Sequence, residues 1–211
     1  DTIAQYFYDN FNYVYPKKIE IKLYTPGTKY CGGIDMGCTD AEGNIYIPPP
    51  KTGPVNNMRD VKGIMHEYTH NVYHQFRFNP PKVLDEGYAV YFSSSVVNDS
   101  RYSLYLNPTN PKNIDDDYDY NTEYEILAFA AALWDARKQL DETIGKNEFD
   151  ELIFESWQLQ PTDNDPGVDG MISLVEASKQ KNGVSSNIHK TNRDIIINAF
   201  ADHGIVCENC F

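Results

Sequence analysis

The stretch HEYTH at residues 66–70 constrains this chain more than any other feature of its sequence. Residues i and i+4 lie on the same face of a helix, so His66 and His70 would present two imidazole nitrogens to one metal ion. Glu67 would lie beside that ion, where it would serve as a general base toward a water molecule. The competing interpretation is a solvated helix that carries several polar residues by chance.

A catalytic zinc site keeps three protein ligands and one open position, so a third ligand is required. Glu86 stands in DEGYAVY, which is typical of the start of a second helix running back past the first. His74 is the rival, but it lies two helical turns from His66, about 12 Å along the axis. The predicted ligand set is therefore His66, His70 and Glu86. The alternative for Glu86 is an ordinary carboxylate near a helix start.

The charge of the chain narrows the kinds of partner that it can have. Thirty-one acidic and eighteen basic residues give a net charge of −13, which disfavours contact with a phosphate backbone. No apolar run is long enough to span a bilayer. We therefore expect neither a nucleic-acid partner nor a membrane partner.

The four cysteines fall in two close pairs, which allow three connectivities. Pairing of neighbours is the simplest, with Cys31 bonded to Cys38 and Cys207 bonded to Cys210. A redox or zinc role for the C-terminal CENC is the alternative. Disulfides and the glycosylation sequon at 98–100 favour an exported, extracellular protein. A chain that begins without Met fits removal of a leader or pro-segment, and equally an arbitrary cut.

Apolar periodicity divides the chain into a mixed first half and a helical second half, which indicates the α+β class. One domain over 1–211 is expected, with an N-terminal lobe (1–95) that holds strands and the HEYTH helix, and a helical C-terminal lobe (96–211). The strand GNIYI is followed by three prolines and is predicted to lie at a sheet edge. Helices are expected near 3–14, 61–76, 85–95, 126–140, 147–157, 170–180 and 191–203, with a capping box at Thr122–Glu125 and Gly204 as a C-cap.

These residues resemble a known family, the zincin metallopeptidases, and within it the thermolysin-like gluzincins, whose third ligand is Glu. HEYTH (66–70) and EGYAVY (86–91) match the two ligand motifs, the second being similar to the EGxAxY form of bacterial collagenases. The apolar helix EILAFAAALWDAR and the last two predicted helices are similar to the helical lobe of fungalysin- and thermolysin-like enzymes. The resemblance implies a two-lobed zincin fold with a small twisted mixed sheet.

The resemblance also implies a function, that of a secreted, monomeric, zinc-dependent endopeptidase acting on a peptide or protein substrate. Asn44, Ile45 and Tyr46 of the edge strand would bind an extended peptide by strand addition. Glu67 would activate zinc-bound water against the peptide carbonyl. The alternatives are an exopeptidase of the same group, for which GGIDMG poorly imitates an amine anchor, and a catalytically silent peptide-binding module.

Two positions depart from the thermolysin pattern. No histidine precedes the helix expected after residue 122, so the donor to the tetrahedral intermediate is predicted to be Tyr120 or Tyr124, although either tyrosine alone is equally explained by packing. Val90 stands where an aspartate usually follows the Glu ligand by four residues. The group that orients a ligand histidine must therefore come from elsewhere.

Two acidic stretches raise calcium as a second cofactor. Residues 115–119 hold four aspartates, for which a solvated loop is the simpler explanation. Residues 165–176 imitate an EF-hand loop, but Gly167 occupies a position that needs an oxygen ligand, and Asp169 would serve equally as a helix N-cap. His189 and His203 are expected at the surface or at helix ends.

Overall fold

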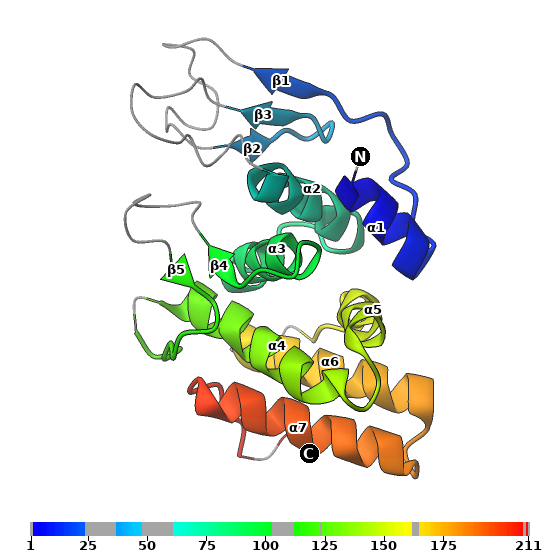
Figure 1. The fold of residues 1–211 in the computed structure, drawn as a ribbon, viewed down its shortest axis with the longest axis vertical. Coiled ribbons are helices and arrows are strands. Elements are labelled where there is room, and N and C mark those ends of the chain that lie inside the picture. The colour runs from blue at the N-terminus through cyan, green and yellow to red at the C-terminus, as the bar shows by residue number, and fades with distance from the viewer. Residues whose placement is uncertain are drawn as a thin grey trace. The chain divides into compact units, whose positions relative to one another are not determined.

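The computed structural model of the chain describes residues 2–23, 37–47, 61–102, 112–122, 124–161, 165–208 and 210 (Figure 1). Helices and a small sheet alternate first, and four long helices follow. The elements are α1 (Thr2–Phe11), β1 (Ile21–Leu23), β2 (Cys38–Thr39), β3 (Ile45–Ile47), α2 (Val61–Phe76), α3 (Lys82–Ser95), β4 (Arg101–Tyr102), β5 (Lys112–Asn113), α4 (Glu125–Asp141), α5 (Lys146–Ser156), α6 (Pro166–Asn182) and α7 (Asn187–Asp202). The predicted α+β class is confirmed.

The chain forms two compact units. The first comprises residues 1–75 and 88–113, and the second comprises residues 76–87 and 114–211. One boundary between the units lies near the end of α2, and another lies within α3. Helix α3 is continuous across its boundary, so it belongs to both units. No helix in the described part of the chain is both long and apolar enough to cross a bilayer.

The sheet of the first unit is mixed, as expected, but its strand order overturns one prediction. β3 pairs in parallel with β1 and antiparallel with β2, so the order is β1-β3-β2 and β3 is the central strand. GNIYI is therefore not an edge strand. The prolines begin at residue 48, directly after the paired residues, so the three residues that pair keep their N–H groups. Ile45 and Ile47 are buried, whereas Ile21 and Leu23 on the edge strand β1 are exposed.

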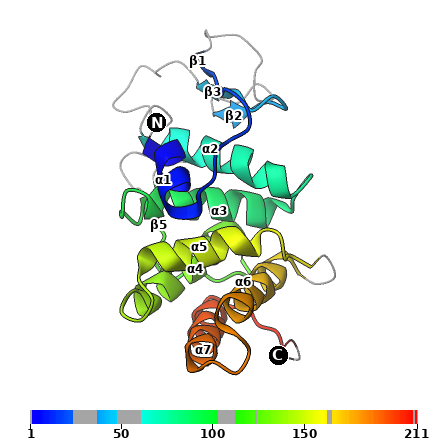
Figure 2. The ribbon, with the colours of Figure 1, turned by 90° about the vertical axis from the view of Figure 1, so that its right-hand side faces the viewer.

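Aromatic side chains hold the helices of the first unit together. The ring of Phe7 on α1 lies 5.8 Å from that of Tyr68 on α2 and 5.4 Å from that of Phe92 on α3. Phe7 is fully buried. The Phe7 side chain thus contacts both helices that carry the HEYTH and EGYAVY motifs. Figure 2 shows α1 beside these two helices.

In the second unit, α4 packs against α5 and α7, and α6 packs against the same two helices. The predicted apolar helix is confirmed, since Ala128 to Trp134 of α4 are all buried. Phe129 is enclosed by two glycines, because an added Cβ would lie 2.5 Å from its ring at Gly87 and 2.6 Å from it at Gly170. Small residues on α3 and α6 therefore let this ring enter the core.

The helix ends differ from the sequence expectations in two places. The capping box at Thr122–Glu125 does not form, because α4 begins at Glu125 with Tyr124 as its N-cap and without a side-chain cap. The N-cap of α6 is Asp165, which accepts a hydrogen bond from Gly167 N, whereas Asp169 is buried inside the first turn. Gly204 follows α7 with φ +77°, as its expected role requires.

Candidate metal centre

Helix α2 carries its polar motif in the interior of the first unit. Residues 65–73 are all buried, a pattern typical of a helix that is covered on every side. Thr69 Oγ1 donates to Met65 O, and Asn71 Nδ2 donates to the backbone oxygen of Gly43 at 2.8 Å, which fixes α2 against the turn between β2 and β3. Burying several ionisable groups is costly unless they have partners. A solvated polar helix face does not describe this stretch.

Helix α3 lies beside α2. The ring of Tyr88 meets that of Tyr73 edge-on, with centroids 5.2 Å apart, and both rings are buried. Glu86 lies on the same helix, and a carboxylate oxygen of Glu86 lies within 4.8 Å of a ring nitrogen of His66 and of His70.

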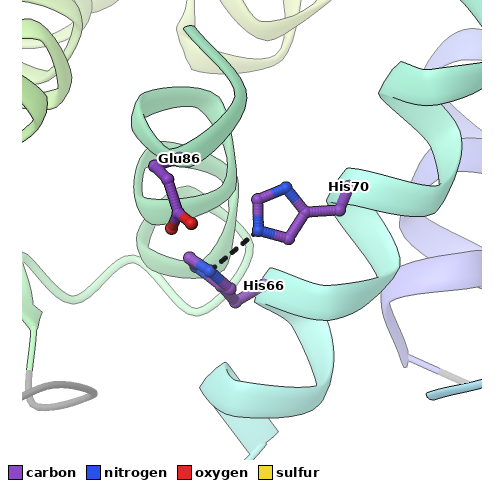
Figure 3. Close-up of side chains that lie close together, drawn as sticks. All are labelled: His66, His70 and Glu86. Carbon is purple, nitrogen blue, oxygen red and sulfur yellow. Dashed lines mark hydrogen bonds between the residues drawn. The ribbon is translucent and has the colours of Figure 1, made fainter. Parts of the chain in front are cut away.

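The structure brings together the three predicted metal ligands (Figure 3). One ligand atom each of His66, His70 and Glu86 lies within 4.8 Å of the other two. The Nε2 atoms of the two histidines are 3.0 Å apart. His66 is 2 % exposed and His70 is 7 % exposed, while Glu86 is half-buried. The three side chains converge on one point, as a shared ion requires.

The spacing of these atoms fits a small divalent ion. Two nitrogens bound to one tetrahedral ion at 2.0–2.1 Å are about 3.3 Å apart, so the histidine pair needs to widen by only about 0.3 Å. Two imidazole nitrogens and one carboxylate oxygen suit transition ions better than calcium or magnesium. The fit follows from the donor set and its spacing.

Glu67 is a buried carboxylate next to His66 in the chain. It follows His66 directly and is 5 % exposed, and it is not one of the three clustered ligands. Tyr68, next along the motif, is buried against Phe7, and burial and the neighbouring Tyr15 raise its pKa to about 12.

A second group of potential ligands overlaps the first. Ligand atoms of His70, His74 and Asp85 also lie within 4.8 Å of one another. His74 is not part of the first set, as the helix geometry predicted, but it does lie in a cluster. The sequence interpretation missed Asp85, although its position directly before Glu86 was a signal. A carboxylate oxygen of Asp85 lies within 4.8 Å of a ring nitrogen of His70.

The two predicted donor tyrosines lie in the second unit. The hydroxyl of Tyr120 accepts a hydrogen bond from Gly167 N at 3.1 Å. Burial and a hydrogen bond to the Asp165 side chain raise the pKa of Tyr120. Tyr124 is 37 % exposed, and its ring lies 5.6 Å from that of Tyr118. Tyr120 thus has a structural role at the start of α6, and the catalytic role of either tyrosine stays a prediction.

The three predicted peptide-binding residues lie in or next to β3. Asn44 and Tyr46 both donate side-chain hydrogen bonds to Asp40, and Ile45 N donates to Glu20 O. These hydrogen bonds stabilise the sheet. The basis for assigning Asn44, Ile45 and Tyr46 to peptide binding, an open edge on this strand, is removed by the strand order.

The cysteine prediction is confirmed for one pair. Cys207 and Cys210 form a disulfide. Cys38 is also disulfide-bonded, while its predicted partner Cys31 lies outside the described residues.

Calcium gains no support from the acidic stretches. Within the described residues, the clusters of three or more histidine, cysteine or acidic side chains are the two on α2 and α3, and both contain histidine. Residues 115–119 and 165–176 form none, so calcium remains a prediction.

The two remaining histidines are more buried than expected. His189 is 4 % exposed and His203 is 2 % exposed, so neither lies at the surface. His203 does end a helix, as the C-cap of α7. Its Nδ1 lies 2.8 Å from Tyr118 O and its Nε2 lies 3.0 Å from Asp135 Oδ2, so it joins α7 to α4.

Comparison with known proteins gives no assignment for this centre: no family model matches the chain, and no curated protein matches it significantly.

Proposed function

We propose that the chain is a zinc-dependent endopeptidase in which His66, His70 and Glu86 hold the ion and Glu67 is the general base. The observation that carries the proposal is the convergence of those three ligands on one point, with a buried glutamate following the first of them. Zinc fits the nitrogen and oxygen donors and the short separation of the histidines.

The division of roles follows from the chemistry of peptide hydrolysis. When bound, the zinc ion supplies a Lewis acid that polarises a peptide carbonyl and acidifies water. Glu67 accepts a proton from the attacking water and delivers it to the leaving amine. Among the described residues, His66, His70 and Glu86 would hold the ion, and three protein ligands are the number that catalytic zinc sites use.

Peptide binding is assigned to the sheet edge closest to α2. Both views place β2 nearest to α2, followed by β3 and then β1 (Figures 1 and 2). The bond from Asn71 to the turn between β2 and β3 fixes this end of the sheet beside the ligand helix. We propose that an extended substrate pairs with β2, in place of the central β3.

Secretion belongs to the same proposal. A disulfide between Cys207 and Cys210 forms readily outside the reducing cytosol. The sequon at 98–100 lies in a turn after α3, with exposed Asn98 at its start.

The alternatives differ from the proposal at testable points. A silent peptide-binding module on the same fold would bind peptides without cleaving them. An exopeptidase would release single residues from one end of a peptide and not cut internal bonds.

Exchange of Glu67 for Gln tests the proposal. The Glu67→Gln variant keeps the size of the side chain and the three ligands but lacks the base, so it should retain zinc and lose peptide hydrolysis by about 100-fold or more. Glu176→Gln, the same exchange in a half-buried glutamate of α6, serves as the control and should keep full activity. Full hydrolysis by zinc-loaded Glu67→Gln would reject Glu67 as the base.

A further inference from the structure

The overlapping cluster on α2 and α3 has the chemistry of an ion site in its own right. Ligand atoms of His70, His74 and Asp85 lie within 4.8 Å of one another, as do those of the first set. We propose that His70, His74 and Asp85 form a second, weaker position for a divalent transition-metal ion, which shares His70 with the first position and lowers activity when it is filled.

The two ion positions arise because the four-residue spacing between histidines occurs twice along α2. His66 and His70 are separated by four residues, and so are His70 and His74, so the two pairs lie one turn apart, about 6 Å along α2. On α3, the consecutive residues Asp85 and Glu86 supply one carboxylate to each pair. Each position therefore has two imidazole nitrogens and one carboxylate, a donor set that suits zinc, cobalt, nickel and copper.

His70 is able to serve both positions because an imidazole has two nitrogens. Its Nε2 faces His66 at 3.0 Å. Figure 3 shows its other ring nitrogen on the side of the ring away from His66. An ion between His70 and His74 would take this second nitrogen. The Asp85 carboxylate lies within 4.8 Å of a ligand atom of each of the two histidines.

Three features make the second position the weaker one. The rings of His70 and His74 have centroids 6.0 Å apart, compared with 4.6 Å for His66 and His70, so they must move further to share an ion. His74 is exposed and Asp85 half-buried, so water competes for the ion. Two divalent ions about 6 Å apart also repel each other.

The effect on activity rests on the proposed function. An ion at the second position would share His70 with the first ion and would place positive charge beside it. Activity should therefore rise as zinc fills the first position and fall in excess zinc.

Reciprocal variants separate the two positions in a binding experiment that needs no activity. Metal-free protein is dialysed against a series of free zinc concentrations, and bound zinc is measured. Wild type should bind one ion tightly and a second at least about tenfold more weakly, and His74→Ala should bind only the tight ion. His66→Ala should lose the tight ion and keep the weak one, and His70→Ala should lose both. Gln75→Ala, an exposed exchange next to His74, should resemble wild type.

The outcomes decide between a second position and none. Binding of a single ion by wild type, or of two by His74→Ala, would overturn the proposal. If His66→Ala fails to fold by circular dichroism, Glu86→Gln removes the same position and carries the test. In the peptidase assay, the zinc concentration that halves activity should rise about tenfold or more in His74→Ala. Absence of all peptidase activity would reject the proposed function, while the binding pattern would still decide on the second position.

Discussion

The Nε2 atoms of His66 and His70 lie 3.0 Å apart on α2, one helical turn from each other and close to the carboxylate of Glu86. Without an ion, one of these nitrogens has to donate a hydrogen bond to the other. With an ion, both direct their lone pairs to the same point. The pair could therefore hold a metal ion, and this relationship supports the first prediction.

Removal of one direct ligand should strongly weaken the tight ion. We expect His66→Ala, or Glu86→Gln, to lower zinc affinity by more than the 10–100-fold that loss of an outer hydrogen-bond partner typically causes. His74→Ala, an exchange on the same helix outside this set, should keep the tight ion. Competition with a chelator of known affinity measures the difference, and equal affinities for Glu86→Gln and His74→Ala would contradict the ligand set.

Gly87 should be required because of Phe129. A Cβ at Gly87 would lie 2.5 Å from the ring of the fully buried Phe129, which Gly170 confines on its other side. We expect Gly87→Ala to reduce the free energy of unfolding by about 1–3 kcal/mol and to weaken zinc binding through the displaced Glu86. Urea denaturation measures the first effect. Adding Phe129→Leu to the Gly87→Ala variant should recover part of the lost unfolding free energy. If the effects of the two exchanges on the unfolding free energy simply add, the contact between Gly87 and Phe129 is contradicted.

Exchange of each candidate tyrosine for Phe should distinguish a structural role from a catalytic one. The Tyr120 hydroxyl is engaged by Gly167 N and the Asp165 side chain, so Tyr120→Phe should lower the free energy of unfolding by about 0.5–1.5 kcal/mol. We expect Tyr124→Phe to leave stability unchanged and to lower kcat about 100-fold, as loss of a hydrogen-bond donor to the intermediate does. Unchanged kcat in Tyr124→Phe, with a loss in Tyr120→Phe, would reverse the assignment.

The pair of His203 and Asp135 should make stability depend on pH. Both partners of the His203 ring, Tyr118 O and the Asp135 carboxylate, accept hydrogen bonds, so both ring nitrogens need a proton. Burial alone would lower the pKa of His203, but these two bonds outweigh it and raise the pKa above 6.5. Burial would likewise raise the pKa of Asp135, but hydrogen bonds from His203 and Lys138 lower it below 3.8.

The sign of each shift sets the pH range. The raised pKa of His203 stabilises the fold fully below pH 6.5, and this contribution is lost as pH rises through the folded-state pKa. The lowered pKa of Asp135 stabilises it above pH 3.8, and this contribution is lost as pH falls through its folded-state pKa. We expect Asp135→Asn to cost about 1–3 kcal/mol near pH 5–6 and less at higher pH. A cost that does not change with pH would reject the charged pair.

The sequence predicted those parts of the protein that depend on local spacing. The clustering of His66, His70 and Glu86 was predicted because an i, i+4 pair and a helix returning past it follow from helix geometry. The strongly apolar α4 was found for the same reason. Both predictions depend on the spacing of residues within a single helix, and the packing of the protein does not change that spacing.

What the sequence did not predict depends on contacts between distant segments. The three prolines after Ile47 favoured an edge strand, but the pairing partners of β3 come from 21–23 and 38–39 and decide its central position. Burial of His203 required Asp135, 68 residues away along the chain. Asp85 gained importance only when α3 was placed beside α2.

Hydrolysis of a mixed peptide library tests the central claim most directly. The chain is stripped of metal with a chelator, divided, and assayed with and without an equimolar amount of zinc, alongside zinc-loaded Glu67→Gln. We expect cleavage at internal peptide bonds by the zinc-loaded wild type alone. Absence of cleavage by a folded chain that has bound zinc through His66, His70 and Glu86 would contradict the account, and release of terminal residues only would replace the endopeptidase with an exopeptidase.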